Sequence, residues 1–297
     1  MFRERPLPED RITLIPTARH IRWLRFLNLH GPLPSQYLFD LEGEKTESQR
    51  RAAQQQLTRL WLGGYVQRPR QQRATENSNY HHYVYDLTDE GRAYLQANGL
   101  RADALRPTGN FVHQLFVSCV TATIDIMCQR EGYRYIPPHE YLDGRSPIVD
   151  VPFAWDGKTH KAPMAPDAVF AIDYGNGSFI AFALEADRNT EPNTSNLPTR
   201  KSDLRSIRQY ATFIGKKLYR QAYGREAMMV LLYVTVSAGH AANFTRLAAD
   251  ELGSPIYVAV GVVPEFQTPF RPPLLLRHLF EEGLIRPGRE PFTIKKP

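Results

Sequence analysis

The stretches Pro166-Asp167-Ala168-Val169-Phe170-Ala171-Ile172 and Phe179-Ile180-Ala181-Phe182-Ala183-Leu184-Glu185-Ala186-Asp187 decide how the second half of this chain folds. Between them lies Tyr174-Gly175-Asn176-Gly177, whose residues accept the positive φ angles of a tight turn, so the pattern predicts a β-hairpin. Asp167 comes just before the first strand, and Glu185 and Asp187 close the second. Because side chains alternate along a strand, Glu185 and Asp187 are expected on the same face. We therefore expect three carboxylates to converge.

The segments around this hairpin predict an α/β domain in which the order αβββ is followed by αβαβ. Apolar residues recur at steps of three and four from Lys201 to about Tyr219, which predicts a helix with one core face. The other expected elements are a helix over 111–130, strands over 133–136, 228–236 and 256–263, and a helix over 241–252. Residues 264–273 are expected to be irregular, and the tail from Leu284 is basic and contains prolines.

Length and composition indicate a folded protein of two domains. The chain has 297 residues, of which 42% are hydrophobic, and we place a domain boundary near Pro107, between residues 1–106 and 107–297. The apolar runs have strand length, and the charged N-terminus lacks the apolar stretch of a signal peptide. We expect a cytoplasmic protein without a membrane segment.

Charge and cysteine content add two expectations. Lys and Arg number 37 against 31 Asp and Glu, a moderately basic balance that is compatible with a nucleic-acid partner. Cys119 and Cys128 are nine positions apart on one expected helix, and so on nearly opposite faces, which predicts two free thiols.

The first hundred residues follow the order of a winged helix-turn-helix. A helix capped by Thr17 ends at Gly31-Pro32, a second begins near Ser35, and a third is expected from Gln49 to Leu62 with Ser48 as its cap. Two strand-like pieces, 65–68 and 80–87, then predict a β-ribbon or wing, and a fourth helix follows Thr88.

Polar and cationic residues on this unit are candidates for contact with double-stranded DNA. The third helix presents Arg50, Arg51, Gln54, Gln55 and Arg59, which suit base edges and phosphates in a major groove. The wing carries Arg68, Arg70, Arg73, His81 and His82, which can reach the DNA backbone. A solvated helix face with a mobile loop, or a protein-docking module, would show the same residues.

The acidic cluster suits metal-dependent phosphodiester hydrolysis. Asp167, Glu185 and the main-chain carbonyl of Ala186 offer the hard oxygen ligands that Mg²⁺ or Mn²⁺ prefers. Such an ion orients water and lowers its pKa, and a nearby lysine assists. Arg205 and Arg208 share a helix stripe with Lys201 and are expected to border the site as further DNA contacts.

The spacing of these acids resembles the PD-(D/E)xK nuclease pattern. Pro166-Asp167 and Glu185-Ala186 are in register with it, but Asp187 stands where the lysine normally lies. The resemblance implies a restriction-endonuclease-like α/β domain with a mixed central sheet, and it makes Lys201 the candidate for a displaced catalytic lysine. It also implies Glu140 as an extra upstream metal ligand. Lys201 as a solvated cation at a helix start, and Glu140 as a surface residue, are the alternatives.

A second resemblance covers most of residues 15–265. Phe182-Ala183-Leu184-Glu185-Ala186-Asp187-Arg188-Asn189-Thr190-Glu191-Pro192, with Lys201 and Tyr210 downstream, resembles the replication-relaxation family of plasmids and conjugative elements. In that family Glu-x-Asp is the usual form, so the resemblance implies a metal-site role for Asp187. It further implies a part in plasmid DNA relaxation, replication or transfer. Tyr210 is either structural or a nucleophile toward DNA, and we favour the structural role.

Three functions fit these patterns. The first is a Mg²⁺-dependent DNA endonuclease or nickase that uses Asp167, Glu185, Asp187 and Lys201 and is targeted by its winged helix. The second is a non-catalytic DNA-binding accessory protein, and the third is a transcription regulator whose second domain binds a small molecule. A homodimer and DNA-processing partner proteins are compatible with each.

Overall fold

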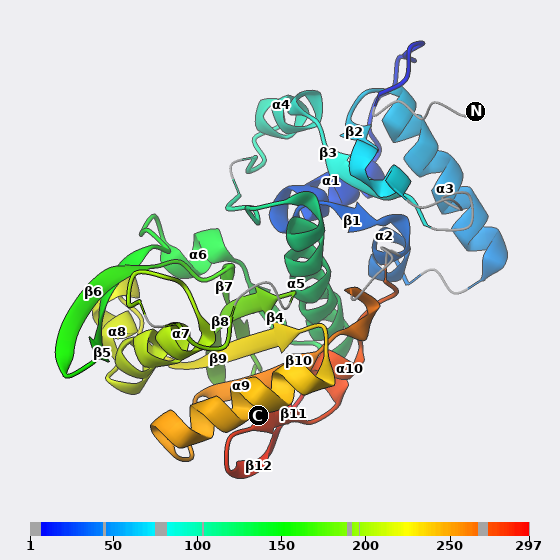
Figure 1. The fold of residues 1–297 in the computed structure, drawn as a ribbon. Helices are drawn as coiled ribbons and strands as arrows, with labels where there is room; N and C mark the ends of the chain where they lie inside the picture. The colour runs from blue at the N-terminus through cyan, green and yellow to red at the C-terminus, as the bar shows by residue number, and fades with distance from the viewer. Residues whose placement is uncertain are drawn as a thin grey trace. The chain divides into compact units, whose positions relative to one another are not determined.

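The computed structural model describes residues 7–43, 46–74, 82–102, 104–188, 192–195, 197–266 and 273–296 (Figure 1). The chain forms two compact units, one of Met1–Ile126 with Thr268–Leu276 and one of Met127–Gln267 with Arg277–Pro297. The sequence boundary between the two units therefore falls inside helix α5 (Phe111–Glu131), rather than at the start of this helix. In the first unit, the buried His30 Nε2 lies 2.9 Å from Asp125 Oδ2, which ties α5 to helix α1. The division into domains of residues 1–106 and 107–297 stays a prediction.

In the described residues, the first unit contains the helices α1 to α4, most of α5, and a small antiparallel sheet with strand order β1-β3-β2. This arrangement agrees with the order of helices and β-ribbon expected of a winged helix. Its elements are α1 (Ala18–His30), β1 (Leu33–Pro34), α2 (Ser35–Leu41), α3 (Glu47–Leu62), β2 (Val66–Gln67), a 3-10 turn (Arg70–Ala74), β3 (Val84–Leu87) and α4 (Asp89–Ala97).

Hydroxyl caps set where α1, α3 and α4 begin. Thr17 caps α1, as predicted, and α4 begins at Asp89 with Thr88 as its cap, in agreement with the expected start at Thr88 or Asp89. The prediction for α3 was wrong by two residues, because Thr46 rather than Ser48 caps it. Thr46 and Gln49 form a capping box in which each side chain bonds the other's backbone amide.

The second unit is built on a seven-stranded mixed sheet with strand order β12-β11-β10-β9-β8-β7-β4. Strands β8, β9 and β10 run parallel, and the pairings of β7 with β4 and β8 are antiparallel, which confirms the predicted α/β class. The strands are β4 (Arg134–Ile136), β7 (Ala168–Asp173), β8 (Phe179–Asp187), β9 (Met228–Thr235), β10 (Val258–Val262), β11 (Leu284–Arg286) and β12 (Arg289–Phe292).

The predicted hairpin supplies β7 and β8, which lie between the middle strand β9 and the edge strand β4. Tyr174 N–H donates to Ser178 O at 3.0 Å across the turn, where Gly175 and Gly177 have φ angles of 74° and 84°. One face of the sheet packs against the helices α7 (Asp203–Tyr210), α8 (Leu218–Tyr223) and α9 (Ala238–Leu252) and shares a hydrophobic core with them. Other described helices of this unit are α6 (Pro138–Leu142) and α10 (His278–Glu281).

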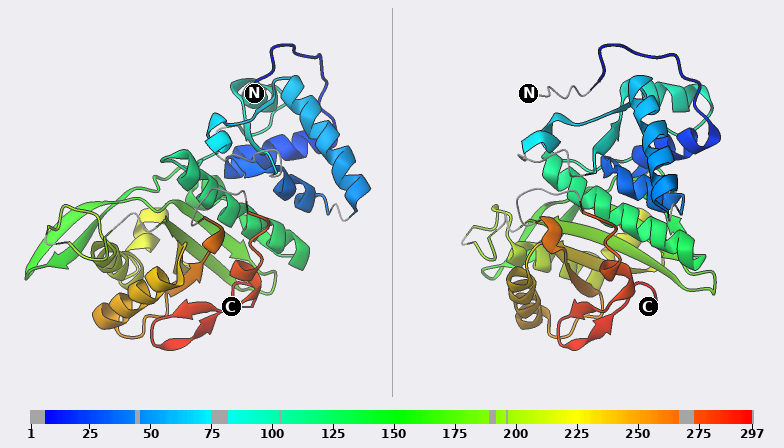
Figure 2. Two further views of the ribbon diagram at one scale, coloured as in Figure 1. Left: turned by 45° about the vertical axis from the view of Figure 1, so that its right-hand side comes forward. Right: turned by 90° about the vertical axis from the view of Figure 1, so that its right-hand side faces the viewer.

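Two hairpins were missed from the sequence. The first, β5 (Val149–Trp155) with β6 (Lys158–Met164), stands apart from the main sheet (Figure 2). Its turn is Asp156-Gly157, with φ angles of 47° and 71°, a strong hairpin signal in the sequence. The second, β11 with β12, forms the edge of the sheet from the basic, proline-bearing tail.

The helix expected from Lys201 to Tyr219 is divided into three pieces. After α7, residues Ala211–Gly215 form a π-helical turn, and Lys217, with a φ angle of 60°, separates that turn from α8. The wider π-turn breaks the 3.6-residue period. Even so, Ile207 and Ile214 lie in the core and Leu218 packs against it, so part of the core face predicted from sequence is kept.

Helix α5 is long and apolar enough to cross a membrane by length and composition, which the sequence analysis did not anticipate. However, 78% of its most apolar window is buried inside the protein, as in the core helix of a folded domain. Both of its cysteines are buried and free, as predicted.

Candidate functional site

Strand register brings Asp167 and Glu185 together at one end of the β7–β8 hairpin. The ladder of this hairpin ends at the pair Ala168–Leu184, and Asp167 and Glu185 are the next residues on the two segments. Asp167 N–H donates to Leu184 O at 2.9 Å, and Asp167 Oδ2 accepts from Ala186 N–H at 2.8 Å, which fixes the aspartate against β8. Burial, and then the charges of Glu185 and Asp167, raise the pKa of Tyr210, so both carboxylates lie near this one side chain. Two of the three predicted acids thus come together at this end of the hairpin.

Glu185 is buried and is held by two side chains from beyond the hairpin. Tyr210 Oη donates to Glu185 Oε1 at 2.6 Å, and Lys201 Nζ lies 3.8 Å from Glu185 Oε2. Burial and the neighbouring Glu185 charge raise the pKa of Tyr210 well above its ordinary value. The tyrosine is thus a protonated donor that orients Glu185, an arrangement that suits a structural role and makes a phenolate nucleophile costly.

Lys201 reaches Glu185 because α7 begins beside the ends of the parallel strands. It directly precedes Ser202, which caps α7 by accepting the Arg205 N–H at 3.3 Å. The Lys201 side chain remains 56% exposed, so its ammonium faces both Glu185 and solvent. The structure thus places Lys201 beside Glu185, and its role as a displaced catalytic lysine stays a prediction.

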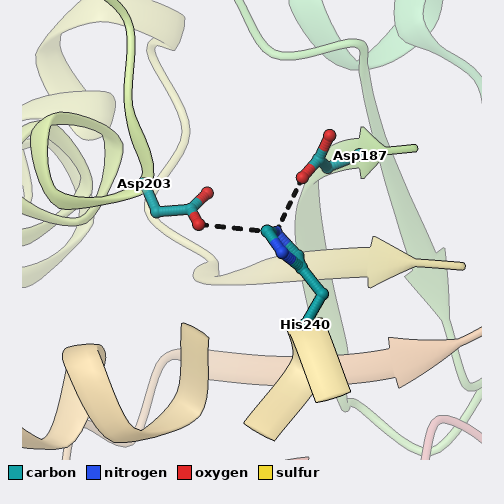
Figure 3. Close-up of side chains that lie close together, drawn as sticks. All are labelled: Asp187, Asp203 and His240. Carbon is teal, nitrogen blue, oxygen red and sulfur yellow. Dashed lines mark ion pairs between the residues drawn. The ribbon is translucent and has the colours of Figure 1, made fainter. Parts of the chain in front are cut away.

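Asp187 points into a second polar group that the sequence analysis did not find (Figure 3). Its Oδ2 lies 2.8 Å from His240 Nε2 and accepts the Tyr233 hydroxyl at 3.0 Å. Asp203 joins from α7, with Oδ2 at 3.4 Å from His240 Nε2 and Oδ1 at 3.2 Å from Tyr233 Oη. The ligand atoms of Asp187, Asp203 and His240 lie within 4.8 Å of one another, so they form a candidate group for a metal ion.

Three elements that are distant in sequence build this group. Tyr233 is the register partner of Glu185 on the parallel strand β9, Asp203 is the first residue of α7, and His240 lies in the first turn of α9. Burial and the Asp203 and Asp187 charges raise the pKa of Tyr233, which keeps its hydroxyl protonated. The sequence carried only weak signals, namely Ser202-Asp203 and Ser237 to His240 at helix starts that follow or face strand ends.

Glu140, predicted as an extra metal ligand, lies in an ion pair with Arg134. Its side chain is 42% exposed, and its backbone carbonyl accepts from Arg225 at 3.1 Å. This environment favours the alternative reading of Glu140 as a surface residue.

Arg205 and Arg208, predicted as DNA contacts, are used inside the second unit. Arg205 is buried, donates to Thr199 O at 2.8 Å and lies over the Phe153 ring. Arg208 makes two 2.9 Å hydrogen bonds to Glu251. The physical reason is the missed β5–β6 hairpin, whose aromatic side chains cover this stripe of α7. The structure does not support a DNA-binding role for either arginine.

The exposed stripe on α3 is narrower than predicted. Arg51, Gln55 and Arg59 are exposed at intervals of four residues, so they share one helix face. By contrast, Arg50 lies 3.6 Å from Asp40, and Gln54 donates to the Tyr85 hydroxyl at 3.1 Å. These two side chains are partly committed to contacts within the unit.

The candidate cations of the wing also differ among themselves. Arg68 donates to Tyr85 Oη at 3.0 Å, and its guanidinium lies 4.2 Å from the ring centroid of Trp61 and 4.3 Å from that of Tyr83. Arg68 therefore packs the base of the wing, whereas Arg70 is exposed. The side chain of Arg73 and all of His81 lie outside the described part of the chain, and His82 is exposed.

Comparison with known proteins gives one family match. A solved structure described as "Structure of SdaI restriction endonuclease" shows 13% identity over 86% of this chain and 90% of that chain, with a TM-score of 0.21, too low for a structural argument. No curated protein matches. The replication-relaxation family matches residues 24–227, which include α2 to α4 of the first unit, the β7–β8 hairpin and α7. This chain therefore belongs to the replication-relaxation family.

Proposed function

We propose that this protein is a metal-dependent DNA endonuclease or nickase that acts in plasmid or mobile-element replication, relaxation or transfer. The observation that carries the proposal is that Asp167 and Glu185 both lie next to the last pair of the β7–β8 ladder, with Lys201 Nζ 3.8 Å from Glu185 Oε2. Two carboxylates and the Lys201 ammonium thus lie at one end of the sheet. The Lys201 side chain is about half exposed, so a substrate can reach it.

The donor set at Asp167 and Glu185 fits Mg²⁺ or Mn²⁺. Both acids supply hard oxygen atoms, and the hydrogen bond from Ala186 N–H holds Asp167 Oδ2 in place. When bound, such an ion lowers the pKa of a water molecule and offsets charge on the phosphate. Glu185 is kept in position by the 2.6 Å hydrogen bond from Tyr210.

Lys201 would act on the phosphate or on the attacking water. Its ammonium is 56% exposed, and its tether at the start of α7 leaves it free to turn from Glu185 toward a bound phosphate. A cation so placed stabilises charge that develops on phosphate oxygens in the transition state.

The winged helix would bring this site to double-stranded DNA. Arg51, Gln55 and Arg59 share an exposed face of α3, the helix that enters the major groove in such folds. We place the protein in the cytoplasm, where plasmid DNA is processed, and we retain a homodimer on paired half-sites and DNA-processing partner proteins as parts of the proposal.

A non-catalytic DNA-binding protein is the second candidate, and one observation favours it. The Lys201 ammonium is paired with Glu185, the carboxylate that would ligate the metal. If that pair were permanent, the site would be a neutralised polar cluster that only positions α7.

Supercoiled plasmid incubated with the protein and Mg²⁺ or Mn²⁺ tests the proposal. We expect nicked or linear product from the wild type, loss of product with Asp167→Asn and Glu185→Gln, and a strong reduction with Lys201→Met. Lys158→Met, at an exposed lysine of β6, is the matched control and should cut normally. Duplex binding without metal-dependent cutting would instead establish the non-catalytic candidate.

A further inference from the structure

The group formed by Asp187, Asp203 and His240 has the spacing of ligands around one ion. His240 Nε2 lies 2.8 Å from Asp187 Oδ2 and 3.4 Å from Asp203 Oδ2. With metal–ligand distances of about 2.1 Å, two ligands are about 3.0 Å apart at right angles and about 3.4 Å apart at the tetrahedral angle. The measured separations fall close to these values.

The polar contacts in the group outnumber the hydrogens that can serve them. Besides its two contacts with the aspartates, His240 Nε2 lies 2.8 Å from Tyr233 Oη, which in turn contacts both aspartates at 3.0 and 3.2 Å. With both aspartates ionised, these five contacts share at most two hydrogens, one on His240 Nε2 and one on the tyrosine hydroxyl.

The charges of the three side chains also favour a bound cation. Two ionised aspartates carry two negative charges in a buried place, and a protonated His240 offsets only one of them. A dication offsets both and leaves His240 neutral, which is the form of imidazole that ligates metals.

The surrounding structure holds these ligands rigidly. Asp203 is 2% exposed in the first turn of α7, and the His240 amide donates to Ser237 Oγ at 3.2 Å at the start of α9. The ring of Tyr233 stacks on Phe244, with centroids 3.6 Å apart and an interplanar angle of 10°. The site is therefore built before any ion arrives.

We propose that Asp187, Asp203 and His240 bind a transition-metal dication of the Mn²⁺ to Zn²⁺ series, at a site distinct from the Asp167–Glu185 pair. The imidazole ligand selects these ions over Mg²⁺, which prefers oxygen donors alone. The Tyr233 hydroxyl orients the two carboxylates from outside the ligand set. The ion joins the end of β8 to the starts of α7 and α9, and it fixes Asp203, two residues after Lys201, so it also positions that lysine.

Metal binding to the full-length, chelator-stripped protein in the absence of DNA tests this site independently of nuclease activity. We expect Mn²⁺ to bind with a ¹⁴N coupling from imidazole in its electron spin-echo spectrum, and Zn²⁺ to displace it while excess Mg²⁺ does not. Asp203→Asn and His240→Gln should weaken Mn²⁺ binding on the order of 100-fold or more, because loss of a ligand exceeds the roughly 10–100-fold effect of a neighbouring residue. Tyr233→Phe should fall within that smaller range.

Asp167→Asn is the matched control, because it changes an acid of the same sheet end outside the proposed ligand set. It should leave the imidazole-coupled ion in place. Absence of ¹⁴N coupling in the wild type would overturn the proposal, as would unchanged affinity in both folded ligand variants. If the variants fail to fold, the wild-type coupling and its displacement by Zn²⁺ still decide the question.

Discussion

Replacing Tyr210 by phenylalanine separates the two roles considered for this residue. Its hydroxyl donates to Glu185 Oε1 at 2.6 Å, and the side chain is 1% exposed in the core beneath α7. Phenylalanine keeps the ring and removes only the hydroxyl, so no large cavity forms. The substitution leaves the buried carboxylate of Glu185 without this donor.

The expected cost follows from the charge of the acceptor. A hydrogen bond to a charged group contributes about 1.5–3 kcal/mol to stability. The folded-to-unfolded ratio of the second unit should therefore fall about 10-fold to 100-fold. Tyr223 is a matched control, because it is equally buried but donates to a neutral acceptor, Pro147 O, at 2.9 Å. Tyr223→Phe should cost only about 0.5–1.5 kcal/mol.

Denaturant unfolding of both variants, followed by far-ultraviolet circular dichroism, measures this difference. A plasmid-nicking assay on the same samples, with denaturing gels for protein–DNA adducts, then tests covalent chemistry. We expect Tyr210→Phe to be less stable and to nick whenever folded, without adducts in either protein. A variant of unchanged stability that loses nicking, or a wild-type adduct that disappears in it, would refute the structural role of Tyr210.

Three further predictions concern the helix α3, Arg208 of α7, and His20. Arg51→Ala and Arg59→Ala should each weaken duplex binding and lower the salt slope by about one, as measured by fluorescence anisotropy over a salt series, while equal slopes would contradict the assignment. Arg208→Met should lower the free energy of unfolding in denaturant by about 1 kcal/mol, because it removes the bidentate, three-quarters buried ion pair with Glu251. The same substitution should leave the affinity for duplex DNA unchanged. Burial, followed by the nearby Arg59 and Arg19 charges, lowers the pKa of His20 from its ordinary value of 6.5, so its stabilising contribution is complete above about pH 6.5 and is lost as pH falls toward the lowered pKa. Unfolding free energies from pH 7.5 to 5 should thus decline more steeply for the wild type than for His20→Gln, and equal slopes would argue against a titrating His20.

Strand β8 contributes one acid to each of the two proposed sites. Glu185 and Asp187 lie two positions apart on β8 and share a face, yet one contacts Lys201 and Tyr210 while the other contacts His240 and Tyr233. Nicking assays test the role of Glu185, and metal-binding spectra test the role of Asp187. Failure of the nuclease proposal can therefore be distinguished from failure of the metal-site proposal.

Sequence by itself determined the local parts of this protein. The β7–β8 hairpin, the shared face of Glu185 and Asp187, and the helix caps at Thr17 and Thr88 depend on turn chemistry, strand alternation and side-chain hydrogen bonds over a few residues. These interactions are readable in one short window. Asp167 and Glu185 come near each other for the same local reason, because they are the next residues after the last pair of this hairpin.

Tertiary structure decided which residues meet those acids. Asp203 and His240 come to Asp187 because β8 and β9 pair in parallel, and the helices α7 and α9, which follow β8 and β9, start at that end of the sheet. Arg205 and Arg208 make contacts within the second unit and do not form the expected DNA surface, because the β5–β6 hairpin, some 50 residues earlier in the sequence, packs over them. Neither outcome has a local sequence signal, since contacts between distant segments depend on strand order and packing rather than on propensity or periodicity.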